Sequence, residues 1–323
     1  MTRFLLRTLQ WLVIAVAVVA IASLLLRRCS RPAPRVNRPV ALAPATGVPA
    51  SPLCYDPHHA DAARANAVSL PSLVFSPFRR TETGWEVYAP LIGHSLGTAC
   101  PPDSPGFAAS LAAWQGGHGL PADGRMDEPT FTRMLRDWYA QRPRLFMTHT
   151  CPDPPPESEL VQLAPSESYG GMTVFLRGDA LAAYRRMIAQ ARADLPSVKA
   201  DPRLLTLFSG YRDPAGDDAR CAAEGDCGTA TRASCSPHRT GLAMDLFLGA
   251  APGFRPDSSA DPNRLYMSRT PEYRWLVANA GRFGFVNYPF EPWHWELRGA
   301  PASLPAPDAG RSSSPPRPAT PPA

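Results

Sequence analysis

The stretch Ser236-Pro-His-Arg-Thr-Gly-Leu-Ala-Met-Asp245 holds a histidine and an aspartate seven positions apart. Its last part, continued to Phe247, alternates in the manner of a strand, so Asp245 faces one side of a predicted sheet. Gly241 permits a turn immediately before that strand. We therefore expect His238 to fold back beside Asp245, which would bring two polar side chains to one centre.

A second segment, Glu291-Pro-Trp-His294, follows some fifty residues later. Its proline fixes one backbone dihedral and biases Glu291 towards an extended conformation, so both polar ends of the segment can face one centre. His238, Asp245 and His294 are nitrogen and carboxylate ligands of the kind that hold catalytic Zn²⁺ and leave a fourth position for water. Glu291 is then left as the candidate base.

A third segment lies upstream of both. Leu204–Phe208 has the composition of a buried strand and leads into Ser209-Gly-Tyr-Arg212. A guanidinium at the end of a strand can donate two parallel hydrogen bonds to a carboxylate, or to the oxyanion that forms when water attacks a carbonyl. Arg212 is therefore the candidate electrophile.

In order and in residue type, these three segments resemble the zinc D,D-peptidases typified by the D-alanyl-D-alanine carboxypeptidases of vancomycin resistance, whose fold is shared with the Hedgehog signalling domain. The family pattern Ser-x-His-x-x-Gly-x-Ala-x-Asp is matched at every fixed position, by Ser236, His238, Gly241, Ala243 and Asp245. Glu-x-x-His is matched by Glu291 and His294. The resemblance spans roughly Met172 to Arg298 and implies an α+β domain with a central antiparallel sheet.

The resemblance also implies a role for each matched side chain. Zinc would be bound by His238, Asp245 and His294. Glu291 would accept a proton from the attacking water, and Arg212 would stabilise the scissile carbonyl. The substrate would lie against Tyr211 and Ser236.

The implied activity is hydrolysis of D-amino-acid-containing bonds in the stem peptides of peptidoglycan, with removal of a terminal D-alanine as the leading hypothesis. Cleavage of cross-links or stem peptides by an endopeptidase is an alternative, because no arginine can be placed from the sequence against a terminal carboxylate. A non-catalytic cell-wall-binding protein and a secreted lytic enzyme are further alternatives. The insertion Asp213 to Cys235 departs from the family pattern and could cover or narrow the cleft.

The N-terminal segment predicts a membrane anchor. Thr8–Leu26 is uncharged and long enough to span a bilayer as one helix. More arginines follow it than precede it, and the positive-inside rule alone would keep the body cytoplasmic. The family resemblance and the cysteines favour instead a chain anchored in the inner membrane with its catalytic domain in the periplasm.

Seven cysteines are present, and six of them follow the membrane-flanking Cys29. Six cysteines suit three disulfides in an oxidising compartment, with fifteen possible pairings. The sequence has no Cys-x-x-Cys, which makes a structural zinc cluster the poorer interpretation.

The net charge of +5 comes almost wholly from arginine, since Lys199 is the only lysine. The basic residues are spread along the chain, without the clusters and interleaved aromatics of a nucleic-acid surface. We therefore expect no nucleic-acid partner.

The chain is predicted to divide into six parts. They are an anchor at 1–29, a Pro/Ala-rich linker at 30–52, a small helical module at 53–150, a linker at 151–171, the zinc domain at 172–300 and a disordered tail at 301–323. The module is predicted to hold two helices, capped by Ser104 and Asp127, in a pattern similar to the peptidoglycan-binding helical repeat. A plain helical packing unit is the alternative. Asp179 and Thr270 are predicted to cap two further helices.

Overall fold

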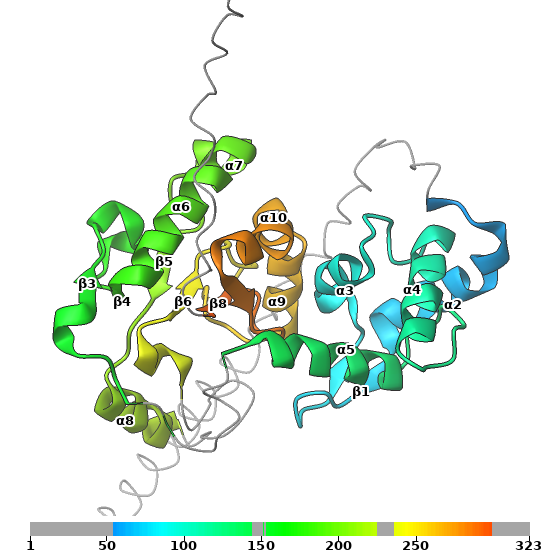
Figure 1. The fold of residues 1–323 in the computed structure, drawn as a ribbon, viewed down its shortest axis with the longest axis horizontal. Helices are drawn as coiled ribbons and strands as arrows, with labels where there is room; N and C mark the ends of the chain where they lie inside the picture. Colours follow the sequence, from blue (N-terminus) through cyan, green and yellow to red (C-terminus); the bar gives the residue numbers. More distant parts are fainter. Residues whose placement is uncertain (1–53, 144–150, 152, 225–235, 299–323) are drawn as a thin grey trace, which may run out of the picture. The chain divides into compact units, whose positions relative to one another are not determined.

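The computed structural model describes residues 54–143, 151, 153–224 and 236–298 (Figure 1). Within these ranges, none of the helices has the length and apolar character needed to cross a membrane. The predicted anchor, the 30–52 linker and the 301–323 tail lie outside the described residues and stay predictions.

The centre of the predicted zinc domain is a four-stranded antiparallel sheet, as expected. Its strands are β5 (Leu207–Ser209), β6 (Ala243–Leu246), β7 (Phe285–Asn287) and β8 (His294–Leu297), in the order β5-β6-β8-β7. In the register of β6 and β8, Asp245 lies opposite His294. The two segments singled out in the sequence therefore lead into neighbouring strands.

Strand β5 is shorter than the sequence predicts. The expected strand was Leu204–Phe208, but Leu205 has a φ of 64°, a left-handed conformation that an extended strand does not contain. Pairing with β6 starts at Leu207, opposite Leu246, and its register shifts before Ser209, which lies opposite Asp245. The hydrophobic composition of the segment is explained by burial of Leu205 and Leu207 in the core.

A second, two-stranded sheet consists of β3 (Leu160–Gln162) and β4 (Phe175–Arg177), so part of the segment predicted as a linker pairs with the zinc domain. Helix α6 (Gly178–Asp194) follows β4 directly, and its N-cap is Arg177. The prediction that Asp179 caps this helix is wrong. Because strand and helix are contiguous, Asp179 lies inside the first turn and pairs with Arg177.

The remaining elements of this domain are short. Thr270 caps its helix as predicted, accepting a hydrogen bond from the Tyr273 N–H. The helices are α7 (Pro196–Ala200), α8 (Pro214–Glu224), α9 (Asp261–Ser268) and α10 (Pro271–Asn279). The 3-10 turns are η5 (Glu157–Glu159), η6 (Pro165–Glu167), η7 (Tyr169–Gly171), η8 (Pro237–Thr240) and η9 (Ala280–Phe283).

The upstream module is mainly helical, and both of its predicted caps are confirmed. Ser104 accepts from the Phe107 N–H and Asp127 from the Thr130 N–H. Its helices are α2 (Ala60–Ser72), α3 (Ala89–Leu96), α4 (Pro105–Gly117) and α5 (Glu128–Gln141). Two 3-10 turns and a two-stranded ribbon complete it: η2 (Pro57–His59), η3 (Glu86–Tyr88), β1 (Val74–Phe75) and β2 (Glu82–Thr83).

One disulfide is described, between Cys54 and Cys100, and it ties the start of the module to the loop before α4. Cys151 is also disulfide-bonded. Cys227 and Cys235 lie outside the described residues. The expectation that the cysteines after Cys29 form disulfides is thus confirmed for Cys54, Cys100 and Cys151.

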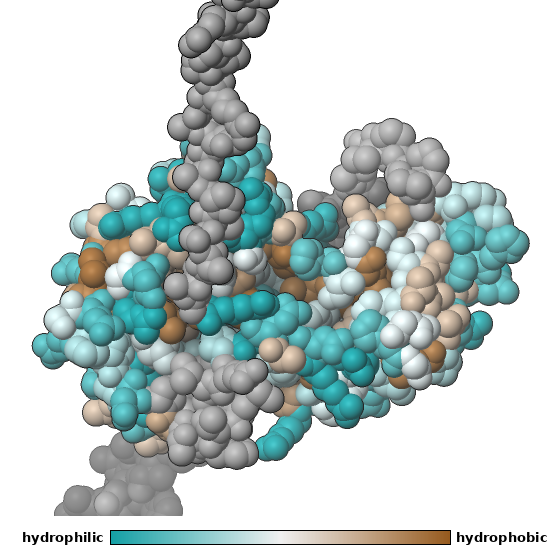
Figure 2. All heavy atoms as spheres, viewed as in Figure 1, coloured by the Kyte–Doolittle hydropathy of each residue, from teal (hydrophilic) through white to brown (hydrophobic). Residues whose placement is uncertain are grey.

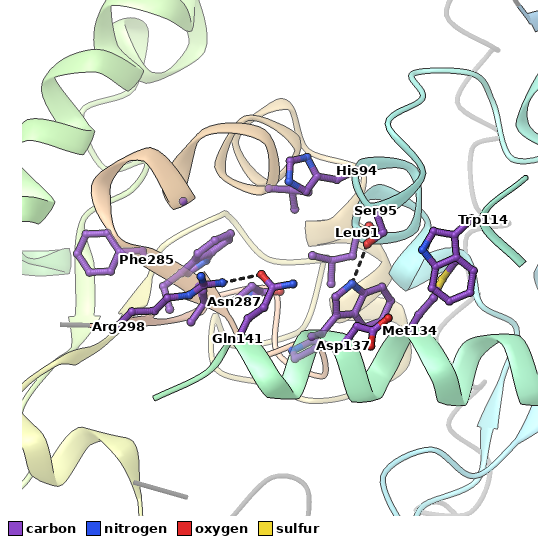
Figure 3. Close-up of a pocket in the computed structure, with 16 residues that line it drawn as sticks. Leu91, His94, Ser95, Trp114, Met134, Asp137, Gln141, Phe285, Asn287 and Arg298 are labelled. Carbon is purple, nitrogen blue, oxygen red and sulfur yellow. Dashed lines mark hydrogen bonds between the residues drawn. The ribbon is translucent and has the colours of Figure 1, made fainter. Parts of the chain in front are cut away.

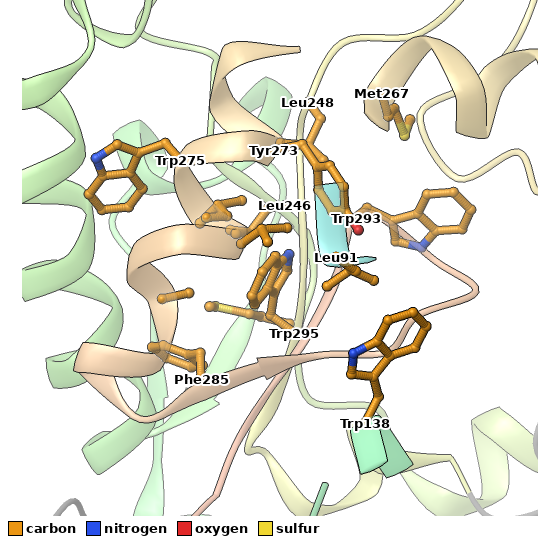
Figure 4. Close-up of a cluster of buried hydrophobic side chains, with 14 of the residues drawn as sticks. Leu91, Trp138, Leu246, Leu248, Met267, Tyr273, Trp275, Phe285, Trp293 and Trp295 are labelled. Atoms are coloured by element: carbon orange, nitrogen blue, oxygen red, sulfur yellow. The ribbon is translucent and has the colours of Figure 1, made fainter. Parts of the chain in front are cut away.

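The module and the sheet share one hydrophobic core, and both belong to one compact unit. Leu91 of α3 and Trp138 of α5 lie in the same cluster as Trp295 of β8 (Figure 4). The surface seen in Figure 2 is mostly hydrophilic, with small hydrophobic patches. Burial of apolar surface therefore joins the module to the zinc domain.

A buried ion pair strengthens this junction. The Arg264 side chain of α9 is fully buried, and its guanidinium donates to the Glu82 carboxylate of β2 at 2.8 Å and to the Phe290 carbonyl at 2.9 Å. The guanidinium also lies 4.0 Å from the centre of the Phe290 ring. Such a pair is costly to break, because loss of one partner leaves a buried charge uncompensated.

We predict that Glu82→Gln lowers the free energy of unfolding by about 3 kcal/mol, the low end of the range for breaking a buried pair, because Asp261 still neutralises part of the Arg264 charge. The measurement is urea unfolding followed by tryptophan fluorescence. The matched control is Glu86→Gln, which breaks the exposed Glu86–Arg269 pair and should cost less than about 1 kcal/mol. Equal stability of the two variants would contradict the prediction.

Candidate metal centre

Three buried side chains meet at the edge where η8, β6 and β8 come together. His238 Nε2 lies 3.2 Å from Asp245 Oδ2 and 3.2 Å from His294 Nδ1. His294 Nδ1 lies 2.9 Å from Asp245 Oδ1. One ligand atom from each residue lies within 4.8 Å of the others, so the group can hold a metal ion.

The turn before β6 forms as the sequence predicts. Ser236 is the N-cap of η8, and its hydroxyl accepts from the His238 N–H. Gly241 ends the turn with a φ of 67°, where a Cβ would also lie 3.1 Å from the Arg177 backbone nitrogen. Glycine is required there for both reasons. The chain reverses, and His238 comes back beside Asp245.

The outward-facing nitrogen of each imidazole fixes the tautomer. His238 Nδ1–H donates to the Gly210 carbonyl at 2.6 Å, and His294 Nε2–H donates to Glu296 Oε1 at 3.0 Å. His238 Nε2 and His294 Nδ1 are therefore the nitrogens turned towards Asp245, and they are the ones that can bind a metal ion. This is the usual arrangement of metal-binding histidines, whose second nitrogen is held by a carbonyl or a carboxylate.

The spacing of the three donors fits zinc. Tetrahedral zinc with bonds of about 2.0–2.1 Å requires ligand atoms roughly 3.3 Å apart. The two imidazole nitrogens are 3.2 Å apart, and they lie 3.2 Å from Asp245 Oδ2 and 2.9 Å from Asp245 Oδ1, respectively. Two neutral imidazoles and one carboxylate also form the donor set of a catalytic site with an open fourth position. The residues present therefore fit the ion that the sequence predicts.

The charges around the cluster favour an ionised aspartate. Burial opposes this charge, but the two histidines outweigh it and hold the pKa of Asp245 below its usual range. Burial, together with Arg212, lowers the pKa of His238. Burial acts in the same direction on His294, but hydrogen bonds to the carboxylates of Asp245 and Glu296 outweigh it and raise its pKa to about 9.

Glu291 lies at the edge of the cluster, with its carboxylate 4.0 Å from His294 Nδ1. Burial, reinforced by the neighbouring Asp245 charge, raises the pKa of Glu291 to about 7. The loop that carries it is fixed by Asn287, whose side-chain amide donates to the carbonyls of Glu291 and His294. A carboxylate with a pKa near neutrality is suited to accept and return a proton.

Arg212 follows β5 and points to Ser236. Its Nη2 donates to the Ser236 hydroxyl at 2.8 Å, and Asp217 lies 3.0 Å from its Nε as an ion-pair partner. Tyr211 is fixed through its backbone, whose N–H donates to the Phe175 carbonyl. Among the described residues, no hydrogen bond joins the Tyr211 side chain to the three ligands.

The first part of the insertion forms α8, and its acidic residues pair with arginines beside the site. Asp217 contacts Arg212 and Arg239, and Asp218 also pairs with Arg239. The Arg239 side chain is buried in these contacts, so its guanidinium is already engaged. The insertion thus holds Arg212 in place from one side. Residues 225–235 lie outside the described part of the chain.

Four groups at the site were not predicted from the sequence to have a function. Glu296 could have been found from the period of two along β8, because it shares a face with His294. The Gly210 carbonyl, Asp217 and Arg142 have no such signal, since they reach the site only through folding. Arg142 belongs to the upstream module and pairs with Glu296.

A cavity of about 340 Å³ lies between the module and the sheet (Figure 3). Trp295 lines it, and because side chains alternate along β8, the cavity is on the opposite face of that strand from His294 and Glu296. Several polar groups in its wall pair with each other, as Arg298 does with Gln141. The cavity is therefore separate from the ligand cluster.

No family model matches this chain, and no curated protein does. The solved structures that are similar to it include two of VanY proteins. One is a mutant of the vancomycin resistance D,D-pentapeptidase VanY from a VanB-type cassette, in complex with Zn(II), with 24% sequence identity over 45% of this chain and 83% of that chain, and a TM-score of 0.27. The other is VanYB in complex with D-alanine-D-alanine, with 24% identity over 44% of this chain and 77% of that chain, and a TM-score of 0.26. Both matches cover less than half of this chain.

We predict that Gly210→Ala weakens zinc binding by about 10-fold or more, as loss of outer-sphere support does in other metal sites. A Cβ at this position would lie 2.4 Å from the Phe175 carbonyl oxygen, so the backbone that accepts from His238 must shift. Zinc affinity would be measured by competition with a chromophoric chelator.

The matched control is Gly216→Ala, where the nearest atom to the new Cβ would be 3.7 Å away. Its zinc affinity should equal that of the wild type. A folded Gly210→Ala variant with wild-type affinity would show that this carbonyl does not support the site.

Proposed function

We propose that this protein is a zinc peptidase that hydrolyses D-amino-acid-containing bonds in peptidoglycan stem peptides. The bond that we favour as its target is the terminal D-alanyl-D-alanine bond. One observation carries the proposal. The ligand set of His238, Asp245 and His294 lies beside a partly buried Glu291, whose pKa is raised to about 7. A metal and a base at one centre are what water-mediated hydrolysis of a peptide bond requires.

Each side chain of the cluster has a task in this reaction. Bound zinc supplies Lewis acidity, which makes water a better nucleophile at neutral pH and polarises a carbonyl. Glu291 accepts the proton of the attacking water and passes it to the leaving amine. Arg212 donates to the oxyanion that develops on the scissile carbonyl, and its contacts with Ser236 and Asp217 hold it ready to do so.

The choice of substrate is supported by the sequence pattern. Ser236 to Asp245 and Glu291 to His294 match the D,D-peptidase motifs at every fixed position, and Ser236 contacts Arg212 directly. Tyr211 and Ser236 are proposed to contact the stem peptide. Arg239, next to His238, is already paired with Asp217 and Asp218.

We also propose that the protein works in the cell envelope, attached to the inner membrane by Thr8–Leu26. The disulfide between Cys54 and Cys100 and the disulfide-bonded state of Cys151 support an oxidising compartment. The peptide substrate is present in that same compartment.

We predict that Glu291→Gln lowers kcat by about 10²- to 10⁴-fold, because the amide cannot accept the proton. Zinc content, measured by elemental analysis, should stay at the wild-type level because the three ligands are intact. Glu159→Gln, at an exposed position before β3, is the control and should keep full activity. Near-normal turnover by the Glu291 variant would disprove the role of this base.

We further predict that the purified full-length protein removes one alanine from a wall pentapeptide, and that a zinc chelator abolishes the reaction. Mass spectrometry of the products measures both. An unchanged pentapeptide together with cleavage of cross-linked wall would assign the activity to an endopeptidase. Binding to intact sacculi that survives the chelator, without any cleavage, would assign the protein to the non-catalytic wall-binding class.

A further inference from the structure

The helical module contributes a side chain to the surroundings of the metal centre. Arg142 follows the last turn of α5, more than 90 residues before His238 in the chain. Its Nε donates to Glu296 Oε2 at 3.1 Å, and its Nη2 donates to Glu296 Oε1. This two-point contact fixes the plane of the carboxylate as well as its position.

The same carboxylate oxygen, Oε1, accepts the hydrogen bond from His294 Nε2. Arg142, Glu296 and His294 therefore form one continuous chain of contacts that ends at Asp245. A carboxylate that rotated away would release the Nε2–H and with it the orientation of the imidazole. Arg142 is thus linked to the His294 imidazole through the Glu296 carboxylate.

All members of this chain are shielded from water. The Glu296 side chain is 1% exposed and the Arg142 side chain 10%. An ion pair in such a place is screened little by salt, and removal of the arginine would leave a buried carboxylate without its counter-charge. That carboxylate would then reorient or draw in water, next to a metal ligand.

Local structure explains why Arg142 reaches Glu296. Pro143 disfavours a helical conformation for the residue before it, so α5 stops at Gln141 and Arg142 is extended, with ψ at 157°. The guanidinium then packs on the Tyr288 ring, 4.5 Å from its centre. Tyr288 lies in turn against the His294 ring. The arginine is positioned by the end of its helix and by the aromatic ring under it.

We propose that Arg142 is a positioning residue for the metal centre: through Glu296 it sets the orientation of His294, so that the helical module is required for tight metal binding. The inference rests on the proposed zinc function. It assigns the module a part in assembling the site, in addition to any contact with the wall.

The test measures zinc affinity of the full chain by chelator competition, and the absorption spectrum of the Co²⁺-substituted protein, which reports ligand geometry. The variants are Arg142→Ala, Arg142→Lys, Glu296→Gln and the double variant Arg142→Ala with Glu296→Gln. Arg133→Ala is the matched control, because Arg133 lies on the same helix in an exposed pair with Asp137. Circular dichroism identifies which variants are folded.

We expect Arg142→Ala and Glu296→Gln each to weaken zinc binding by about 10- to 100-fold and to change the Co²⁺ spectrum. The double variant should bind zinc as tightly as the single variant with the lower affinity, because both substitutions act through one contact. Arg142→Lys should recover part of the affinity, since an ammonium replaces the charge but not the two-point contact. Arg133→Ala should match the wild type.

Wild-type zinc affinity in folded Arg142→Ala and Glu296→Gln would overturn the inference. If Arg142→Ala does not fold, the nearly isosteric Glu296→Gln decides alone, and wild-type affinity there would overturn it equally. If the wild-type chain itself binds no zinc, the proposed function fails. If the wild type binds zinc and the variants have the same zinc affinity, only the role of Arg142 is disproved and the proposed function stands.

Discussion

The antiparallel register of β6 and β8 is the constraint on which the site depends. It sets Asp245 opposite His294 and Ala243 opposite Glu296, so the polar residues of both strands share one face. A slip of one residue would turn His294 to the other face of the sheet and dissolve the cluster. The register therefore has to be secured by the rest of the structure, and packing on both sides of the strands does this.

Burial gives the cluster its chemical character. Polar groups removed from water need hydrogen-bond partners, and each buried polar group of this cluster has one. Asp245 lies between two imidazoles, and these are held in turn by Gly210 and Glu296. The same exclusion of water raises the pKa of Glu291 towards neutrality, so one physical cause orders the ligands and tunes the base.

The module and the zinc domain are joined by three kinds of interaction. Apolar side chains from both lie in one core, Arg264 and Glu82 form a buried ion pair, and Arg142 contacts Glu296. These contacts have different roles in the fold, but each is shielded from water. The junction is therefore part of the folded core, and the metal centre lies close to it.

The sequence by itself determined the local features: the helix caps at Ser104, Asp127 and Thr270, the turn at Gly241, and the alternation that makes β6 a strand. Each depends on residues close together in the chain, which is why patterns of a few residues suffice. Sequence could not show that Leu205 interrupts its strand, because that depends on packing. Only the tertiary structure decided that Arg142 meets Glu296, because a contact between distant residues has no periodic signature and exists only after the core has formed.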